Sequence, residues 1–247
     1  MAGEPGGLMV KIPVYLGQAH ECSYLPELVA HSQFIDPGFP MNASIYSELA
    51  AQGFRRSGDL VYRPDCPGCN ACVPVRLELD RFFPNRSQRR VLRRNEDLHA
   101  TIKPALFEEA HYRLYLRYLK QRHAEGAMSC SGPEEYMNFL ASRWADTVFV
   151  EFSRQQELMA VAVVDRLTDA WSSVYTFYGP EFPERSLGTL AVLWQTKEAQ
   201  RQGKRWLYLG FWIERCRKMA YKSQYRPLQA LIGSQWLSFE KGELIGG

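Results

Sequence analysis

The spacing of apolar residues predicts most of the secondary structure in the second half of the chain. Leu114, Tyr115 and Tyr118 recur at helical spacing, and short apolar runs bounded by turn residues are typical of strands. The predicted elements are, in order, helices at 107–124 and 133–144, strands at 147–152, 158–166 and 171–178, a helix at 187–201, a strand at 206–210, a helix at 215–222 and a strand at 228–232. This order predicts an α+β domain in which helices are layered on a largely antiparallel sheet.

The first part of the chain consists of shorter elements separated by Pro, Gly and Cys. Asn42 or Ser44 can cap a short helix that ends near Gly53. Apolar runs predict strands at 60–63 and 73–79. Longer helices and strands, with regularly spaced apolar residues, are predicted only after about residue 98. We therefore expect a smaller N-terminal domain, which contains cysteines, and a larger second domain, at residues 1–98 and 99–247.

Length and composition exclude several classes of protein. A chain of 247 residues with 46% hydrophobic residues can bury a core, which excludes bulk disorder. No apolar run approaches the ~18 residues of a membrane span, and the N-terminus lacks the pattern of a secretory signal. We therefore expect a cytoplasmic protein with no membrane contact. The net charge of +3 does not by itself indicate a nucleic-acid partner. Evidence for such a partner has to come from the way the charged residues are distributed along the chain.

Five arginines form the most unusual feature of that distribution, namely Arg86, Arg89, Arg90, Arg93 and Arg94. On a helix these positions fall within one stripe of roughly 140°, with Val91 and Leu92 outside it. Guanidinium groups bind phosphate oxygens through paired hydrogen bonds, so the stripe predicts contact with a nucleic-acid backbone, which we interpret as RNA. The pattern alone does not separate RNA from DNA. The alternative is a solvated face, or arginines paired with distant carboxylates.

Three thiols follow one another in a turn-rich loop, as Cys66, Cys69 and Cys72. Successive C-x₂-C spacings suit a structural zinc ion or an iron–sulfur cluster, and both need a fourth ligand. The candidates for that ligand are Cys22, in the same part of the chain, and then His20 or His31. Cys130 and Cys216 belong to the other half. The alternative is a set of buried or redox-sensitive thiols that binds no metal.

Polar residues interrupt the apolar pattern of the second half. Asp165 ends one predicted strand, and Tyr175 lies within the next. Buried polar groups cost stability unless they are hydrogen-bonded, so these side chains are expected to be paired or to line a cavity, unless the strands simply alternate on a half-exposed face. Further along, Lys218, Tyr221 and Lys222 share one face of a predicted helix. They could hold an anionic group, or could form an ordinary basic surface.

The order of elements also resembles the GCN5-related N-acetyltransferase (GNAT) fold, in which an acyl donor lies where two central strands splay apart. Gly188, near the start of a predicted helix, would let backbone N–H groups approach an anion. Leu190 departs from the acetyl-coenzyme A loop of GNAT enzymes, where Gly or Ala occupies this position. This departure disfavours a coenzyme A donor.

Short motifs throughout the chain resemble the bacterial aspartate/glutamate leucyltransferases, relatives of the eukaryotic arginyl-tRNA–protein transferases. The motifs include CSYLP at 22–26, RRSG at 55–58, CVPVR at 72–76, RSQRR at 86–90, SVYTF at 173–177, SLGT at 186–189 and KMAYK at 218–222. The resemblance implies a cysteine-bearing N-terminal domain followed by a GNAT-like transferase domain. It also implies that leucine moves from leucyl-tRNA to the α-amino group of proteins beginning with Asp or Glu. Such transfer marks those proteins for degradation by the N-degron pathway.

The expected reaction needs no cofactor, because the ester of the aminoacyl-tRNA is already activated. Positioning of the two substrates then supplies much of the catalysis. Asp165 or Tyr175 would accept or relay a proton from the amine. The acceptor's carboxylate would need a cation, and the candidates are Arg76, Lys218 and Lys222, with Tyr221 beside them. The alternatives are an arginyl donor, an RNA-binding protein without catalysis, and an acetyl-coenzyme A-dependent N-acetyltransferase.

Overall fold

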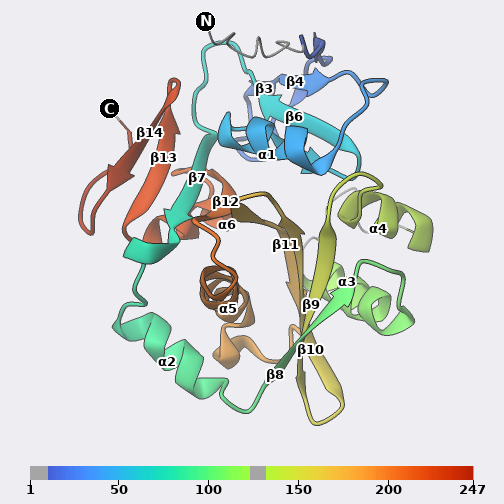
Figure 1. Ribbon diagram of the computed structural model, residues 1–247, viewed down its shortest axis with the longest axis vertical. Coiled ribbons are helices and arrows are strands. Elements are labelled where there is room, and N and C mark those ends of the chain that lie inside the picture. Colours follow the sequence, from blue (N-terminus) through green and yellow to red (C-terminus); the bar gives the residue numbers. More distant parts are fainter. Residues whose placement is uncertain (1–10, 123–131, 247) are drawn as a thin grey trace, which may run out of the picture.

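A mixed sheet of eight strands forms the centre of the molecule (Figure 1). The computed structural model describes residues 11–122 and 132–246. The strand order is β14 (Gln235–Phe239), β13 (Leu228–Ile232), β7 (Val73–Glu78), β12 (Trp206–Trp212), β11 (Ala170–Tyr178), β10 (Glu157–Arg166), β9 (Thr147–Arg154) and β8 (His99–Pro104). The pair β11 and β12 is parallel, and the other neighbours are antiparallel. This is the α+β class that the sequence predicts.

Helices and the N-terminal unit cover the two faces of this sheet. Helix α5 (Leu187–Arg201) packs on one face, with α2 (Arg86–Arg94) beside it. Helices α3 (Glu109–Arg122) and α4 (Pro133–Leu140) pack on the other. Strand β10 shows why both faces are apolar, because Val161 and Val163 face α3 and α4, whereas Ala160 and Ala162 face α5. The sheet is therefore buried from both sides.

The N-terminal unit has a small sheet of its own. Its strand order is β1 (Val14–Leu16), β4 (Ser32–Ile35), β6 (Leu60–Pro64) and β5 (Arg55–Ser57), and β2 (His20–Glu21) pairs with β3 (Val29–Ala30). Helix α1 (Ala43–Ala51) is capped by the Asn42 side chain, which accepts the Ile45 N–H, as predicted. Tyr46 and Leu49 of α1 share one apolar cluster with Tyr208 of β12. The unit therefore packs directly on the large sheet.

The large sheet includes one strand from before residue 98, the expected domain boundary. Strand β7 was assigned to the first domain, but it lies inside the large sheet, between β12 and β13. Its residues Val75 and Leu77 are fully buried in the core formed with α5. The reason is that strand pairing joins segments far apart in sequence, which composition does not reveal. Strand β7 therefore precedes residue 98 in the chain and still belongs to the large sheet.

Other elements are close to their predicted positions, with several differences. The helix predicted at 133–144 ends at Leu140, and the one at 215–222 is split into α6 (Arg217–Ala220) and a 3₁₀ turn (Tyr221–Gln224). Strands β1 to β5, β8 and β14 have no counterpart among the predicted elements. Two further 3₁₀ turns occur at Leu79–Arg81 and Pro183–Arg185. The end of the helix predicted at 107–124, and Cys130, lie outside the described residues. Within the described ranges, no helix combines the length and apolar character needed to cross a membrane.

Candidate functional site

The two central strands of the sheet diverge in the direction of the chain. Strands β11 and β12 pair only at their first three positions, the last of which joins Ser172 to Tyr208. Beyond it β11 continues to Tyr178, and β12 continues to Trp212. Each strand also has a register irregularity just past this point, and Gly210 adopts φ 79°. The facing strand edges therefore carry backbone N–H and C=O groups that β11–β12 pairing does not use.

The first turn of α5 lies at the far end of this divergence. Gly188 packs against Tyr178, the last residue of β11, so closely that an added Cβ would lie 3.3 Å from Cε1 of the ring. A larger residue at position 188 would therefore press on the end of the strand. Ser186, before the helix, adopts the left-handed conformation with φ 54°. This places the helix N-terminus, which favours negative charge, beside the diverging strands.

The arginine stripe forms on α2, as the sequence predicts. The side chain of Asn85 accepts the N–H of Gln88, and the side chain of Gln88 accepts the N–H of Asn85, which closes a capping box. Val91 and Leu92 are partly buried against the core, on the opposite side from the charges. The five stripe residues are all exposed, namely Arg86, Arg89, Arg90, Arg93 and Arg94. Within the described part of the chain, none of them is in an ion pair, so the structure does not show the distant carboxylates that were one alternative.

Helix α2 is fixed beside the start of α5. Arg94 donates to the carbonyl of Glu184, and Asn95 Nδ2 donates to the carbonyl of Arg185 at 2.9 Å. Arg185 also pairs with Asp97 at 2.8 Å. These contacts attach the arginine face to the loop between β11 and α5. The exposed positive charge and the diverging strands therefore meet at one end of α5.

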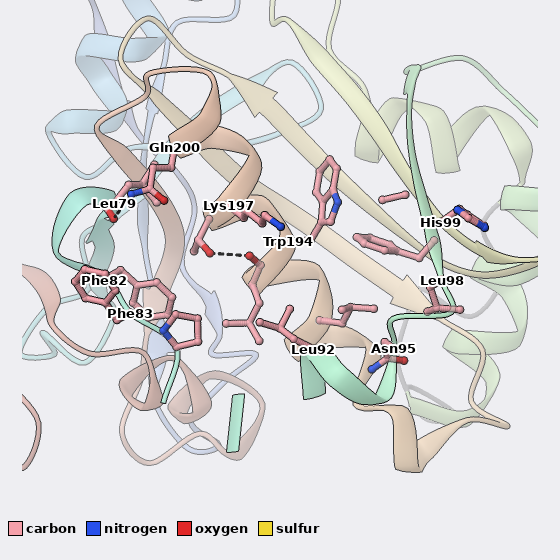
Figure 2. Close-up of a pocket in the computed structure, with 16 residues that line it drawn as sticks. Leu79, Phe82, Phe83, Leu92, Asn95, Leu98, His99, Trp194, Lys197 and Gln200 are labelled. Carbon is pink, nitrogen blue, oxygen red and sulfur yellow. Dashed lines mark hydrogen bonds between the residues drawn. The ribbon is translucent and has the colours of Figure 1, made fainter. Parts of the chain in front are cut away.

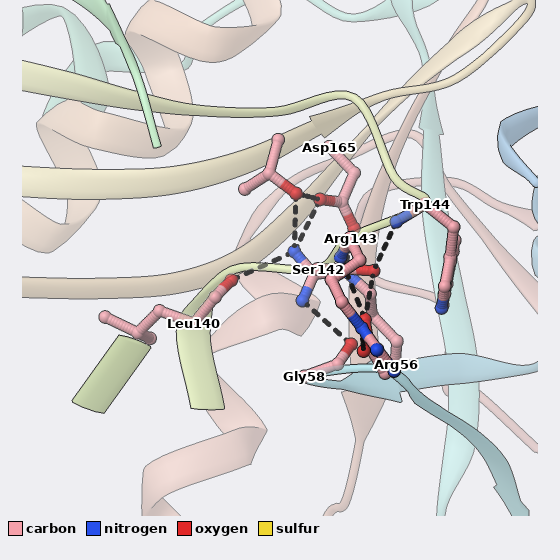
Figure 3. A network of polar contacts seen from close by, with 9 residues as sticks. Arg56, Gly58, Leu140, Ser142, Arg143, Trp144 and Asp165 are labelled. Atoms are coloured by element: carbon pink, nitrogen blue, oxygen red, sulfur yellow. Dashed lines mark hydrogen bonds and ion pairs between the residues drawn. The ribbon is translucent and has the colours of Figure 1, made fainter. Parts of the chain in front are cut away.

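Asp165 lies in a buried ion pair (Figure 3). Its two carboxylate oxygens accept from Nη2 and Nε of Arg56, both at 2.6 Å. Thr147 Oγ1 donates to the same carboxylate at 2.8 Å. The Asp165 and Arg56 side chains are 0% exposed. Burial would lower the pKa of Arg56, but the adjacent carboxylate more than offsets this and raises it. Both oxygens of this carboxylate already accept hydrogen bonds from Arg56 and Thr147, which argues for a structural role instead of the proton transfer expected from the sequence.

Tyr175 lies in the diverging part of β11. Its ring packs on those of Tyr115 and Tyr118 of α3, at centroid distances of 6.3 Å each, and on Phe139 of α4 at 5.3 Å. The side chain therefore points toward the face of the sheet that α3 and α4 cover. Its position beside the divergence keeps it a candidate for proton relay.

The residues expected to bind the acceptor do not converge on one exposed surface. Lys218 and Tyr221 are exposed, whereas Lys222 is buried and donates to the Phe211 carbonyl at 2.6 Å. The shared helix face was therefore a wrong prediction, because the chain changes from an α-helix to a 3₁₀ turn at Tyr221. Burial, and then repulsion by Arg55, lower the pKa of Lys222 to about 7.

Arg76 is buried by aromatic rings. Its guanidinium carbon lies 3.6 Å from the ring centroid of Trp206 and 4.1 Å from that of Trp236. Arg76 Nε donates to Gln229 Oε1 at 2.9 Å, and Nη1 contacts the Tyr208 hydroxyl at 3.3 Å. Arg76 and Lys222 therefore belong to the interior, between the N-terminal unit and the large sheet.

Sequence reasoning missed Arg55, a third buried cation beside these two. It is 6% exposed, and its Nη1 donates to the carbonyls of Ala50 and Phe54. Its Nε and Nη2 are buried and have no hydrogen-bond partner in the described structure. Desolvation lowers the pKa of Arg55, and the charge of Arg76 lowers it further. The sequence did carry a signal for this burial. Consecutive residues on a strand point to opposite faces of the sheet, so of two adjacent arginines on a strand that is covered on one face, one is expected to point into the interior.

The cysteines form one group that crosses the expected domain boundary. Cys22, Cys69 and Cys72 pack in one apolar cluster with Cys216, which the sequence had assigned to the other half. Burial, and then the neighbouring thiols, raise the pKa of Cys72 to about 12. Among the described residues, however, no three of these sulfur atoms lie within 4.8 Å of one another. In this arrangement the thiols do not form a closed four-ligand zinc site.

A separate cluster does bring three potential ligand atoms within 4.8 Å, on Glu108, His111 and Glu151. Lys103 Nζ already lies 3.0 Å from Glu108 and 2.9 Å from Glu151, and His111 Nε2 lies 2.6 Å from Glu151. The lysine therefore lies between the two carboxylates and balances part of their negative charge. We interpret this cluster as a structural link between α3, β8 and β9.

Comparisons with known proteins agree on one family. Residues 20–90 match "Arginine-tRNA-protein transferase, N terminus", and residues 110–232 match "Arginine-tRNA-protein transferase, C terminus". The chain is similar to the aspartate/glutamate leucyltransferase of Pseudomonas putida KT2440, with 47% identity over 230 residues, which are 93% of this chain and 98% of that protein. It is also similar to the protein of the same name from Marinobacter nauticus, with 49% identity over 217 residues, or 88% and 92% of the two chains.

Two solved structures show more distant similarity. FemX has a TM-score of 0.45 at 9% identity, over 81% of this chain and 79% of that one. L-PGS from Bacillus licheniformis has a TM-score of 0.45 at 13% identity, over 57% and 45% of the two chains. Scores of this size support no statement about function.

Proposed function

The chain belongs to the arginine-tRNA-protein transferase family, and from this premise we propose that it transfers leucine from leucyl-tRNA to proteins that begin with Asp or Glu. The leucine donor and the acidic acceptors follow from the name of the similar Pseudomonas and Marinobacter proteins. The product is a protein that begins with leucine, marked for degradation by the N-degron pathway.

The reaction is an aminolysis of an ester. The acceptor's α-amino nitrogen attacks the carbonyl carbon of the leucyl ester, a new C–N bond forms, and the C–O bond to the tRNA ribose breaks. One proton leaves the amine, and one proton reaches the ribose oxygen. Because the ester is already activated, holding the amine against the carbonyl supplies much of the rate. Tyr175, beside the divergence, is the proposed proton relay, and backbone N–H groups of the diverging strands are the proposed donors to the oxyanion.

One observation carries the donor assignment: the exposed arginine face adjoins the start of α5. Arg94 and Asn95 attach α2 to the loop that precedes α5, and Gly188 of α5 packs on the end of β11. A phosphate backbone held by α2 would therefore bring the 3′ ester to the diverging strands. Arginines on the opposite side of the molecule could not do this.

For the acceptor, we propose that the buried guanidinium groups of Arg55 and Arg76 attract its acidic side chain. Neither forms an ion pair with a described carboxylate, so their positive charge is unbalanced locally. We expect Arg55→Met to raise the KM for an Asp-starting peptide about tenfold, on the order of one lost charged hydrogen bond, with tRNA affinity unchanged. Arg63→Met, at a partly exposed arginine of the same unit, is the control. An unchanged KM in Arg55→Met would remove this residue from the acceptor site.

The direct test offers leucyl-tRNA and arginyl-tRNA separately to the purified protein, together with peptides starting with Asp, Glu, Asn or Gln. Mass spectrometry should show addition of one leucine to the Asp and Glu peptides alone. Addition of arginine would instead support the arginyl alternative. Peptides of unchanged mass with every donor would overturn the proposed activity.

Binding of a structural zinc ion or an iron–sulfur cluster by the cysteine group stays a separate proposal. Cys22, Cys66, Cys69 and Cys72 would supply the four ligands after a rearrangement of their side chains. The transfer reaction uses no such group. Metal and sulfide analysis of anaerobically purified protein tests the proposal, and protein without stoichiometric metal would contradict it.

A further inference from the structure

An apolar groove of about 480 Å³ runs along α5, between that helix, α2 and the start of β8. Figure 2 shows Phe82 and Phe83 at one end and His99 at the other, with Trp194 and Lys197 of α5 between them. The groove has the size of a small-ligand site. Nothing in the transfer reaction described above uses it.

Aromatic and aliphatic side chains form the walls, and basic groups surround them. Phe83 is 75% exposed, so its ring is accessible to a ligand. Lys197 lines the groove and is exposed. No aspartate or glutamate lies among the described residues that line it. The groove therefore combines flat apolar surfaces with positive charge.

The groove is continuous with the arginine face of α2. Leu92 lines both this groove and a shallow hollow formed by Arg86, Arg89 and Arg93. Arg89 donates to the carbonyl of Pro84, itself a groove residue, at 2.6 Å. At the other end of α2, Asn95 lines the groove and binds the loop before α5. A chain that follows the arginines toward the start of α5 would therefore pass the groove.

We propose that this groove binds an unpaired nucleotide of the donor tRNA, upstream of the 3′-terminal adenosine, with its base against Phe83 and Trp194 and its phosphate on Arg89 or Arg93. The inference rests on the proposed function, because tRNA is its ligand. Bases of single-stranded RNA stack on aromatic side chains while arginines and lysines hold the backbone. A purely apolar partner would leave the surrounding cations unpaired, whereas a nucleotide satisfies both parts of the groove.

The test compares two RNAs and two variants by filter binding or anisotropy. The RNAs are the intact tRNA and the same tRNA trimmed to a blunt acceptor stem. Phe83→Ala should weaken binding of the intact tRNA about tenfold, on the order of one lost base stack, and should leave binding of the trimmed tRNA unchanged. Tyr15→Ala, at an exposed aromatic residue of the N-terminal unit, should change neither.

Two outcomes would overturn the inference: equal affinity of Phe83→Ala and wild type for intact tRNA, or an equal loss with both RNAs. If the first outcome is found and an apolar peptide binds in the groove instead, the groove belongs to a protein partner. Leucylation of the Asp peptide by the wild type is measured in parallel. If the wild type leucylates the peptide and Phe83→Ala binds tRNA as the wild type does, only the proposal for the groove is rejected. If the wild type does not leucylate the peptide, the proposed function is rejected.

Discussion

The buried charged residues of this protein differ in whether a partner of opposite charge balances them. Asp165 and Arg56 neutralise one another in the interior. Arg55, next to Arg56 in sequence, has no described carboxylate partner, and Lys222 donates to a backbone carbonyl. A buried charge without a partner costs stability, so its retention is more readily explained by binding than by folding. The contrast between Arg55 and Arg56 therefore separates a candidate binding residue from a structural one.

Replacing Asp165 by Asn should destabilise the fold without changing the chemistry. Arg56 would stay buried with an uncompensated charge, which costs about 3–5 kcal/mol. Chemical denaturation measures this loss. Asp146→Asn, which breaks the exposed pair with Arg166, is the control and should cost less than about 1 kcal/mol. Full stability of Asp165→Asn together with a collapsed transfer rate would return Asp165 to the proton-transfer role.

Lys222 should make stability depend on pH. Its pKa is about 7 in the folded protein and ordinarily 10.5, so between these values the unfolded chain binds the additional proton. Stability then rises with pH from about 7 toward 10.5, with a contribution of up to about 1.4 kcal/mol per pH unit from this group. Denaturation at several pH values should show a smaller slope in Lys222→Met. Lys218→Met, at an exposed lysine, should keep the wild-type slope, and identical slopes in all three proteins would contradict the prediction.

At the scale of the element, helix α2 shows how a local pattern can specify both structure and function. The capping box at Asn85 and Gln88 defines its start, and Val91 and Leu92 turn the helix so that its charges face solvent. Every one of these features is visible within ten consecutive residues, so the sequence predicted the helix and its charged face together. The 215–222 segment was less predictable, because the packing of Lys222 against β12 decides where the helix ends.

The arginines of α2 should govern the salt dependence of tRNA binding. Each phosphate contact releases counterions, so loss of one contact should reduce the slope of log K against log salt by about 0.7–0.9. We expect Arg90→Gln to show such a reduction in affinities measured over a range of salt concentrations. Arg113→Gln, at an exposed arginine of α3, should leave the slope unchanged. Equal slopes in the Arg90 variant and wild type would remove this contact from the interface.

At the scale of the whole molecule, β7 connects the two units. It follows the N-terminal unit in sequence but pairs with β12 and β13 of the large sheet. Cys216 is likewise brought beside Cys22 and Cys72, and the ion pair of Arg56 with Asp165 joins the units again. Strand pairing, the cysteine group and the Arg56–Asp165 ion pair therefore link the N-terminal unit to the large sheet at this junction.

A fragment of residues 99–247, the expected second domain, should fail to fold cooperatively. It lacks β7, so β12 and β13 lose their shared neighbour and the core loses Val75 and Leu77, both fully buried. A fragment of residues 70–247 keeps β7 but loses Arg56, the partner of the buried Asp165. With Asp165→Asn to remove the unpaired charge, it should retain a cooperative thermal transition, at a lower temperature than the full chain. Circular dichroism during heating distinguishes the two. A cooperative transition in the 99–247 fragment would show that the boundary at residue 98 was adequate.

Neighbouring residues in the chain were enough to predict the long helices, the strands of the meander from β9 to β11, the arginine helix and the family resemblance. Contacts between distant residues became visible only in the folded chain. Arg56 and Asp165 are 109 residues apart in sequence, and β7 enters a sheet whose other strands all follow it in the chain. The physical reason is that periodicity reports which side of an element is buried, whereas pairing of strands and charges depends on the packing of the whole chain. This is why Asp165 read as catalytic in the sequence and lies in an ion pair in the fold.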